Sequence, residues 1–137
     1  MNIRSVLAAA CATVAFTVAM SAAAHGTGET VTPSFEHAIP NIPGKALTVV
    51  VDYAPGGASP SHEHAKSAFI YAYVVSGAIE SQVNDGPKRI YRAGESFFEE
   101  PGSLHRVSRN ASKTRPAKLL AVFVADSDDK PLTTPVK

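Results

Sequence analysis

The stretch GGASPSHEH, residues 56–64, contains two histidines one residue apart, His62 and His64. Alternate residues of a β-strand point to the same face, so both imidazoles can reach one metal ion. A third histidine, His105, follows the run Glu100-Pro101-Gly102. We expect His62, His64 and His105 to bind a divalent transition metal (Fe, Mn, Ni, Cu or Zn) and to leave coordination positions open for water or substrate.

The N-terminal residues 1–24 are typical of a secretory signal peptide. Arg4 precedes an apolar run from Val6 to Met20, and the small residues Ser21-Ala22-Ala23-Ala24 follow. The apolar run is shorter than the about 20 residues that cross a bilayer, which favours cleavage after Ala24 over an uncleaved membrane anchor. We therefore predict a periplasmic or secreted protein that loses its only cysteine, Cys11, and is not attached to a membrane.

The rest of the chain has the length of one ordinary domain and contains no cysteine for a disulfide. The formal net charge of the whole chain is +1, and the basic residues are scattered. This charge distribution argues against a nucleic-acid partner or an anionic membrane surface. A small core without disulfides favours association, so we expect a homodimer that binds a small-molecule ligand or substrate.

Short strands separated by turn residues account for most of the sequence after residue 45. No window has a sustained apolar period of a helix, so we expect little helix. We interpret Ser76-Gly77 as a tight hairpin turn between two of the strands. Many short strands at regular spacing predict an all-β barrel or sandwich. The predicted strands cover residues 46–53, 69–75, 78–83, 88–91, 96–99, 104–108 and 118–125.

The segments on either side of this strand-rich region are rich in Pro, Thr, Gly and Asp. We therefore divide the chain into a signal peptide (1–24), an N-terminal arm (25–45), a barrel (46–125) and a C-terminal tail (126–137). The arm contains Ser34–Pro40, which is a candidate for an additional edge strand.

The region from Gly56 to Asn110 resembles the two sequence motifs of the cupin superfamily. The residues that match the first motif are Gly56, His62, His64 and Gly77, and those that match the second are Gly94, Gly102, His105 and Asn110. The resemblance implies a cupin-type jelly-roll β-barrel in which the three histidines bind a metal. It also implies pairing of the barrel with a second copy.

The sequence departs from the family pattern at Ile70, which stands where cupins have a metal-binding glutamate. No acidic residue occurs between His64 and Gly77. One interpretation is a degenerate barrel that binds nothing. We favour a three-histidine centre similar to that of the thiol dioxygenases in the same superfamily, because an empty barrel has no need of imidazoles on one face.

Two adjacent acidic residues, Glu99 and Glu100, precede the turn before His105. They are either a solvated pair, or one of them turns inward and replaces the missing carboxylate or serves as a general base. Adjacent residues of a strand face opposite ways, so at most one can do so. We favour Glu100 as the catalytic candidate, because it is nearer to His105. By the same alternation Glu63 is expected to point away from the metal.

Together these features predict a secreted or periplasmic metal-binding cupin. The first hypothesis is a non-haem, metal-dependent, dioxygenase-like enzyme that acts on a small oxygenated substrate. The alternative is a barrel that binds a metal or a small ligand without turnover. A third hypothesis is an empty scaffold whose role is association.

Overall fold

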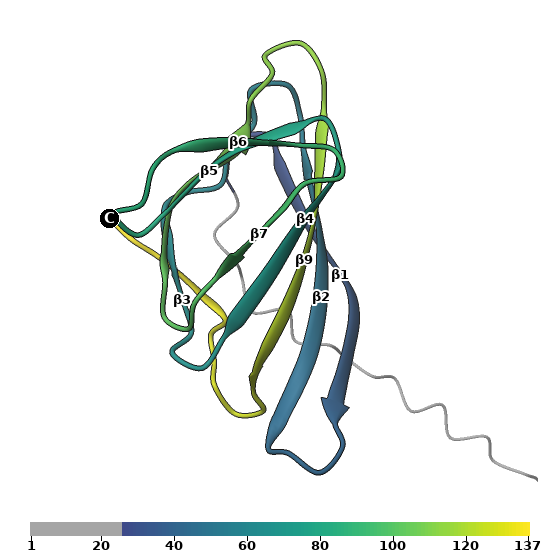
Figure 1. Ribbon diagram of the computed structural model, residues 1–137, viewed down its shortest axis with the longest axis vertical. Helices are drawn as coiled ribbons and strands as arrows, with labels where there is room; N and C mark the ends of the chain where they lie inside the picture. The colour runs from purple at the N-terminus through teal and green to yellow at the C-terminus, as the bar shows by residue number, and fades with distance from the viewer. Residues whose placement is uncertain (1–25) are drawn as a thin grey trace, which may run out of the picture.

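Two antiparallel sheets face each other in the computed structural model, which describes residues 26–137 (Figure 1). The described residues form no helix, so the all-β jelly-roll prediction is confirmed. They accordingly include no helix that could cross a membrane. The predicted signal peptide, with Cys11, lies outside the described residues.

Each sheet has five strands. Sheet I contains, in spatial order, β1 (Glu29–Ile39), β2 (Gly44–Tyr53), β9 (Ala117–Asp126), β4 (Phe69–Ser76) and β7 (Ser96–Glu99). Sheet II contains β10 (Thr133–Pro135), β3 (His62–His64), β8 (Leu104–Asn110), β5 (Ala78–Val83) and β6 (Arg89–Arg92). The seven strands predicted between residues 46 and 125 are all present, with ends displaced by no more than two residues, and the candidate edge strand at Ser34–Pro40 lies, apart from Pro40, within the longer β1.

The chain passes from sheet I to sheet II at Ser76-Gly77, because β4 belongs to one sheet and β5 to the other. The prediction of a hairpin turn at this point is therefore wrong. Gly77 has a φ of +71°, and a Cβ atom added there would lie 2.6 Å from the carbonyl oxygen of Pro116. The glycine thus serves a tight corner that turns the chain out of its sheet.

The core lies between the sheets, and its two walls differ in chemistry. The inward face of sheet I is mostly apolar and includes Val74, Leu119 and Phe123, all nearly inaccessible to solvent, with Glu99 of β7 as a buried charged exception. The inward face of sheet II carries buried polar side chains, among them His64, His105, Ser81, Ser108 and Asn110. Buried polar groups need partners, so this face is where a site is expected.

Both terminal segments belong to the sheets. β1 pairs with β2 from Glu29 opposite Tyr53 to Ile39 opposite Gly44, so the predicted arm (25–45) is mostly an edge strand rather than a loose segment. In the predicted tail (126–137), β10 pairs with β3, placing Thr133 opposite His64. The barrel domain therefore includes strands on both sides of residues 46–125. The polar composition that suggested loose segments is that of strands exposed at sheet edges.

Candidate metal centre

The three predicted histidines meet on the inner face of sheet II. His62 of β3 lies opposite His105 of β8 in the ladder between these strands. The ring centroids of His62 and His64 are 4.8 Å apart, and that of His105 is 5.3 Å from His62. Glu63, between the first two, is exposed as expected. One nitrogen from each of the three rings lies within 4.8 Å of the others.

His62 is oriented by the backbone. Its Nδ1 lies 2.8 Å from the carbonyl oxygen of Pro60, an acceptor, so Nδ1 carries the proton and Nε2 keeps a free lone pair. Burial lowers the pKa of His62 to about 4, so the ring is neutral at physiological pH. A neutral imidazole with its second nitrogen fixed by a hydrogen bond is the form that binds metal ions.

His64 is buried and packs edge-on against Phe123, with ring centroids 5.6 Å apart. Neither of its ring nitrogens has a hydrogen-bond partner. An unpaired buried imidazole is unfavourable, because the ring has lost its contacts with water. A bound ion would compensate for this loss.

His105 is held from both sides. Its Nε2 lies 2.8 Å from the hydroxyl oxygen of Ser81, and its Nδ1 lies 3.1 Å from Oε1 of Glu99. The ring also meets Phe97 edge-on, with centroids 6.0 Å apart. These contacts fix the position of the third imidazole in the absence of an ion.

Glu99 is the acidic residue of the centre. Its side chain is 3% exposed, and its Oε2 lies 3.1 Å from Nε2 of His64 without hydrogen-bond geometry. Burial alone would raise the pKa of Glu99, but the neighbouring imidazoles of His105 and His64 outweigh it and lower the pKa to about 2. Adjacent ligand atoms of an ion with bonds of about 2.1 Å lie about 3 Å apart, which matches the spacing of Glu99 and His64.

The expectation that Glu100 rather than Glu99 turns inward is wrong, because Glu100 is exposed. In β7, Phe97 and Glu99 face the interior while Phe98 faces solvent, and the alternation carries Glu100 outward. The nearness of Glu100 to His105 along the chain was a poorer guide than this alternation.

The residues fit a divalent transition metal. An ion with bonds of about 2.1 Å holds its ligand atoms at most about 4.2 Å apart, so small side-chain rotations would close a set now within 4.8 Å. His64 and Glu99 supply buried polar atoms that otherwise lack partners. Three imidazoles and one carboxylate are ligands that Fe, Mn, Ni, Cu and Zn accept.

A cavity of about 100 Å³ between the sheets opens onto the histidines. Its middle is apolar and includes Val51, Leu119 and Ala121. Residues of both terminal strands, such as Val31 and Thr133, also line it. The arrangement offers a small, largely apolar compartment with a metal centre in its wall, as is usual for small-molecule sites.

A second polar cluster, absent from the sequence predictions, lines the same cavity. It consists of Glu29, Tyr53, Ser59 and Ser108. The Tyr53 hydroxyl lies 2.6 Å from Oγ of Ser59 and 2.9 Å from Oγ of Ser108. Burial raises the pKa of Tyr53 to about 12, so the phenol keeps its proton. We call this set the hydroxyl cluster.

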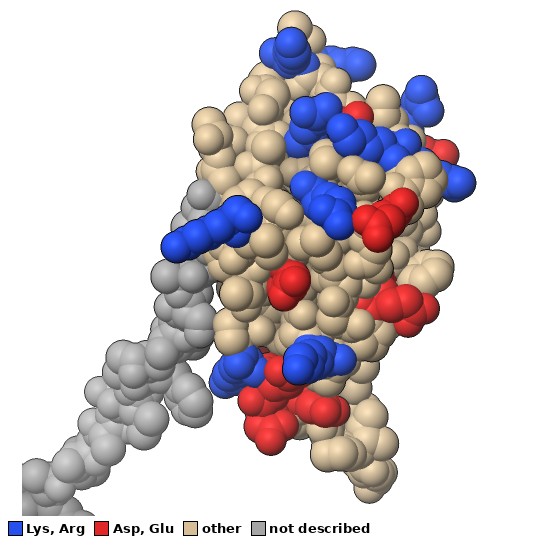
Figure 2. Space-filling view, turned by 90° about the vertical axis from the view of Figure 1, so that its left-hand side faces the viewer, with Lys and Arg blue, Asp and Glu red and all other residues tan. Residues whose placement is uncertain are grey.

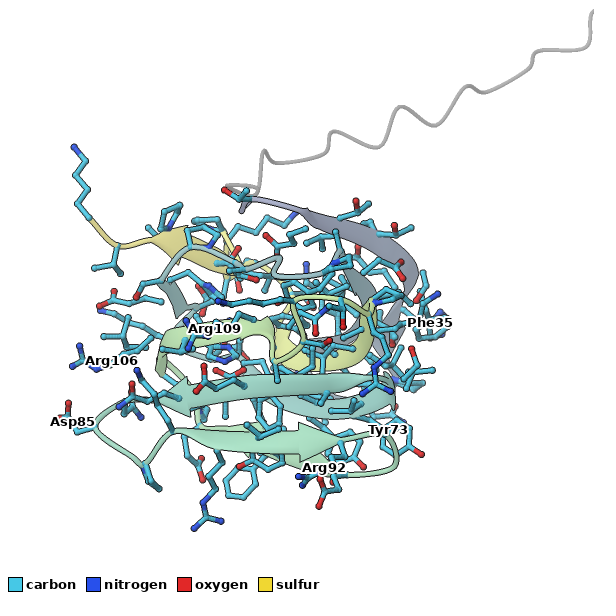
Figure 3. The ribbon with its side chains drawn as sticks, turned by 90° about the horizontal axis from the view of Figure 1, so that it is seen from above. Phe35, Tyr73, Asp85, Arg92, Arg106 and Arg109 are labelled. Atoms are coloured by element: carbon cyan, nitrogen blue, oxygen red, sulfur yellow. The ribbon has the colours of Figure 1, made fainter. Side chains whose placement is uncertain are left out.

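The charged side chains outside the cavity are of mixed sign. Basic and acidic groups are interspersed on the face seen in Figure 2. Figure 3 shows Arg106 and Asp85 together at the periphery of the molecule, where they form an ion pair of 3.0 Å. Arg109 pairs with Glu80 in the same way.

Comparison with known proteins agrees with the fold. The family model described as "Cupin domain" matches residues 49–123, more than half of the chain. The chain therefore belongs to the cupin domain family. No curated protein matches this sequence significantly.

Solved structures with a similar fold include two kinds of enzyme. An oxalate oxidase in complex with the substrate analogue glycolate has a TM-score of 0.63 and 25% identity. The match covers 80% of this chain and 56% of the oxalate oxidase chain. A double-stranded β-helix protein from Klebsiella pneumoniae has a TM-score of 0.62, 21% identity and coverage of 80% and 84%. A structure of DMSP lyases has a TM-score of 0.56, 20% identity and coverage of 67% and 44%. The chain thus spans little more than half the length of the oxalate oxidase.

Proposed function

We propose that this cupin is a metal-dependent enzyme that binds a small oxygenated compound at a centre formed by His62, His64, His105 and Glu99. The observation that carries the proposal is His64, a buried imidazole without a hydrogen-bond partner that lies beside two further imidazoles and a carboxylate. A divalent ion compensates for the burial of all four groups.

The bound metal would supply a Lewis acid with open positions for an oxygen donor and for O₂. Pro60 fixes the tautomer of His62. His105 contacts Ser81 through one ring nitrogen and Glu99 through the other, so it would exchange one of these contacts for the ion and keep the other as its orienting hydrogen bond. The apolar walls formed by Val51 and Leu119 exclude water from the ligand. Oxygen-dependent oxidation of a small carboxylate fits these features, and the likeness to an oxalate oxidase with bound glycolate supports the same class.

Metal-dependent oxygen consumption tests the proposal. Metal-free protein is loaded with each of the five ions in turn and assayed with oxalate, glycolate and related small carboxylates in an oxygen electrode. We expect one ion to support consumption, with loss in His62→Ala and no loss in His37→Ala, a substitution of an exposed histidine on β1. A protein that binds metal but consumes no oxygen with any compound would support the alternative, a non-catalytic binding barrel.

We also propose that the protein is a homodimer in which a second copy covers the outer face of sheet I. Aromatic side chains gather on that face, where Tyr71 is 44% and Phe98 is 58% exposed, and Phe69 stacks on Phe98 with centroids 6.0 Å apart. Exposed apolar patches of this kind mark interfaces. Phe98→Glu is expected to give a monomer in analytical ultracentrifugation. Ile90→Glu, at an exposed position of β6, is the control.

Export from the cytoplasm is the corresponding proposal for residues 1–24. Expression of the whole chain with its own N-terminus is expected to yield a periplasmic or secreted protein that begins at His25. N-terminal sequencing of the fractionated protein measures this directly. An unprocessed cytoplasmic product would contradict it.

A further inference from the structure

The hydroxyl cluster is a chain of hydrogen bonds whose direction the structure determines. Glu29 accepts at both carboxylate oxygens, from the backbone N–H of Gly26 at 2.7 Å and from the hydroxyl of Ser59 at 2.5 Å. Ser59 has therefore used its only proton. The Tyr53 hydroxyl, 2.6 Å from Ser59, must donate to it.

The same reasoning extends to the last member of the chain. Tyr53 has spent its proton on Ser59, so Ser108, 2.9 Å away, must donate to the tyrosine oxygen. The high pKa of Tyr53, raised to about 12 by burial, keeps that proton in place. Each hydroxyl proton in this series of hydrogen bonds thus points toward Glu29. The oxygen of Ser108 retains only lone pairs, and Ser108 lines the cavity.

We propose that this end of the cavity binds a hydroxyl group of the substrate through Ser108. Glu29 makes the site prefer a hydroxyl over a keto group, because it fixes the direction of the hydrogen bonds that end at Ser108. The inference rests on the proposed function, because the other end of the substrate is the oxygen donor that binds the metal. The substrate class is a compact hydroxy acid. The preferred group is a hydroxyl rather than an ammonium, because Ser59 and Tyr53 stand between Glu29 and Ser108 and a buried cation that contacts a neutral serine is unfavourable.

The size of the substrate follows from the strand that carries both ends. His105 and Ser108 are three residues apart on β8, about 10 Å along the strand at most. A ligand that reaches from the metal to Ser108 therefore has about four or five carbons. The apolar wall between the two ends, formed by Leu119 and Ala121, accommodates its carbon chain.

Glu29 acts through the other residues and is a positioning residue. In Glu29→Gln the amide oxygen accepts from Gly26, which leaves the amide nitrogen to donate to Ser59. Ser59 then donates to Tyr53 and Tyr53 to Ser108, so the chain reverses and Ser108 directs a proton into the cavity. A change of ligand preference upon an isosteric substitution is a result that a purely structural role of Glu29 does not give.

Calorimetric titration of the metal-loaded protein with matched acids tests the proposal. The probes are β-hydroxybutyrate, acetoacetate and butyrate, and γ-hydroxyvalerate, levulinate and valerate. We expect the wild-type protein to bind at least one hydroxy acid about tenfold more tightly than its keto partner, because a ketone brings lone pairs against the lone pairs of Ser108. Glu29→Gln should reduce or invert this ratio, and Ser108→Ala should bring it close to one.

The matched control is Glu36→Gln, the same substitution at an exposed position of the same strand, which should leave the ratio unchanged. Metal-dependent binding of the acids with no hydroxy preference at either chain length would overturn this inference and leave the proposed function intact. A ratio that Glu29→Gln leaves unchanged would overturn the role of Glu29. Absence of any metal-dependent binding of the acids would overturn both the inference and the proposed function.

Discussion

Ile70 of β4 and Glu99 of β7 are opposite partners in the ladder that joins these strands, and both side chains line the cavity. Opposite residues of an antiparallel pair share a face, with Cβ atoms about 4.5–5.5 Å apart. Ile70 occupies the position at which the cupin motif has its glutamate. The neighbouring strand therefore presents a carboxylate beside the position from which the motif glutamate is missing.

The first prediction concerns the two adjacent glutamates. Glu99→Gln removes a charge from the centre with little change of shape and is expected to weaken metal binding about 10- to 100-fold. Glu100→Gln, at the exposed neighbouring position, should have no effect. Competition with a chromogenic chelator measures both affinities. A loss in Glu100→Gln, or none in Glu99→Gln, would show that the carboxylate has been assigned to the wrong residue.

A second prediction exchanges the cross-strand pair. Glu99→Ile alone should lose metal affinity, because the carboxylate is gone. The double variant Ile70→Glu with Glu99→Ile returns a carboxylate to the same face, one strand away, and should recover most of that affinity. The chelator competition assay applies again, with circular dichroism as the check on folding. The idea fails if the folded double variant binds metal no better than Glu99→Ile.

Alkaline pH should destabilise the protein through Tyr53. Its pKa is about 12 in the folded protein and 10 as a free side chain. Between these values the unfolded chain releases the proton while the folded protein retains it, so the free energy of unfolding falls as pH rises from 10 to 12. The loss attributable to this group is about 2 to 3 kcal/mol. Urea titrations across this pH range should show a smaller decline in the free energy of unfolding in Tyr53→Phe than in the wild-type protein. Equal declines in the two proteins would contradict the assignment of this loss to Tyr53.

The corner at Gly77 gives a prediction about stability. Gly77 and Gly94 both have a positive φ, of 71° and 89°, but only Gly77 leaves no room for a methyl group. Gly94→Ala is expected to cost about 1–2 kcal/mol from the backbone conformation alone. Gly77→Ala should cost about 1–3 kcal/mol more, because its Cβ meets the backbone of Pro116. Urea unfolding of the two variants measures the difference, and similar values would contradict the close approach.

Local sequence patterns predicted the strands well and their pairing less well. The β-branched run from Ala46 to Tyr53 and the turn residues around Gly86 identify strands without reference to distant parts of the chain. Ser76-Gly77 carries the signals of a hairpin turn, yet β4 pairs with β9 and β7 instead of β5. Which sheet a strand joins depends on contacts with residues far away in the sequence, and no local pattern encodes it.

The candidate site was predicted in part for similar reasons. The spacing of His62 and His64 predicts that they share one face of a strand, and the family motif identifies His105 as the third histidine of the site. The choice between Glu99 and Glu100 depends on the phase of β7, which Phe97 and Phe98 leave undetermined because both are apolar. The hydroxyl cluster draws its four residues from β1, from β2, from β8 and from the loop that precedes β3. Single hydroxyl residues are too common in strands for the sequence to indicate such a cluster.

Metal content measures the central claim most directly. Protein expressed from His25 without an affinity tag is analysed by elemental mass spectrometry, together with His105→Ala and the exposed control His37→Ala. We expect about one equivalent of Fe, Mn, Ni, Cu or Zn per chain in the wild-type protein and in His37→Ala, and almost none in His105→Ala. Absence of metal from the wild-type protein after reconstitution, or equal amounts in all three, would contradict the three-histidine centre.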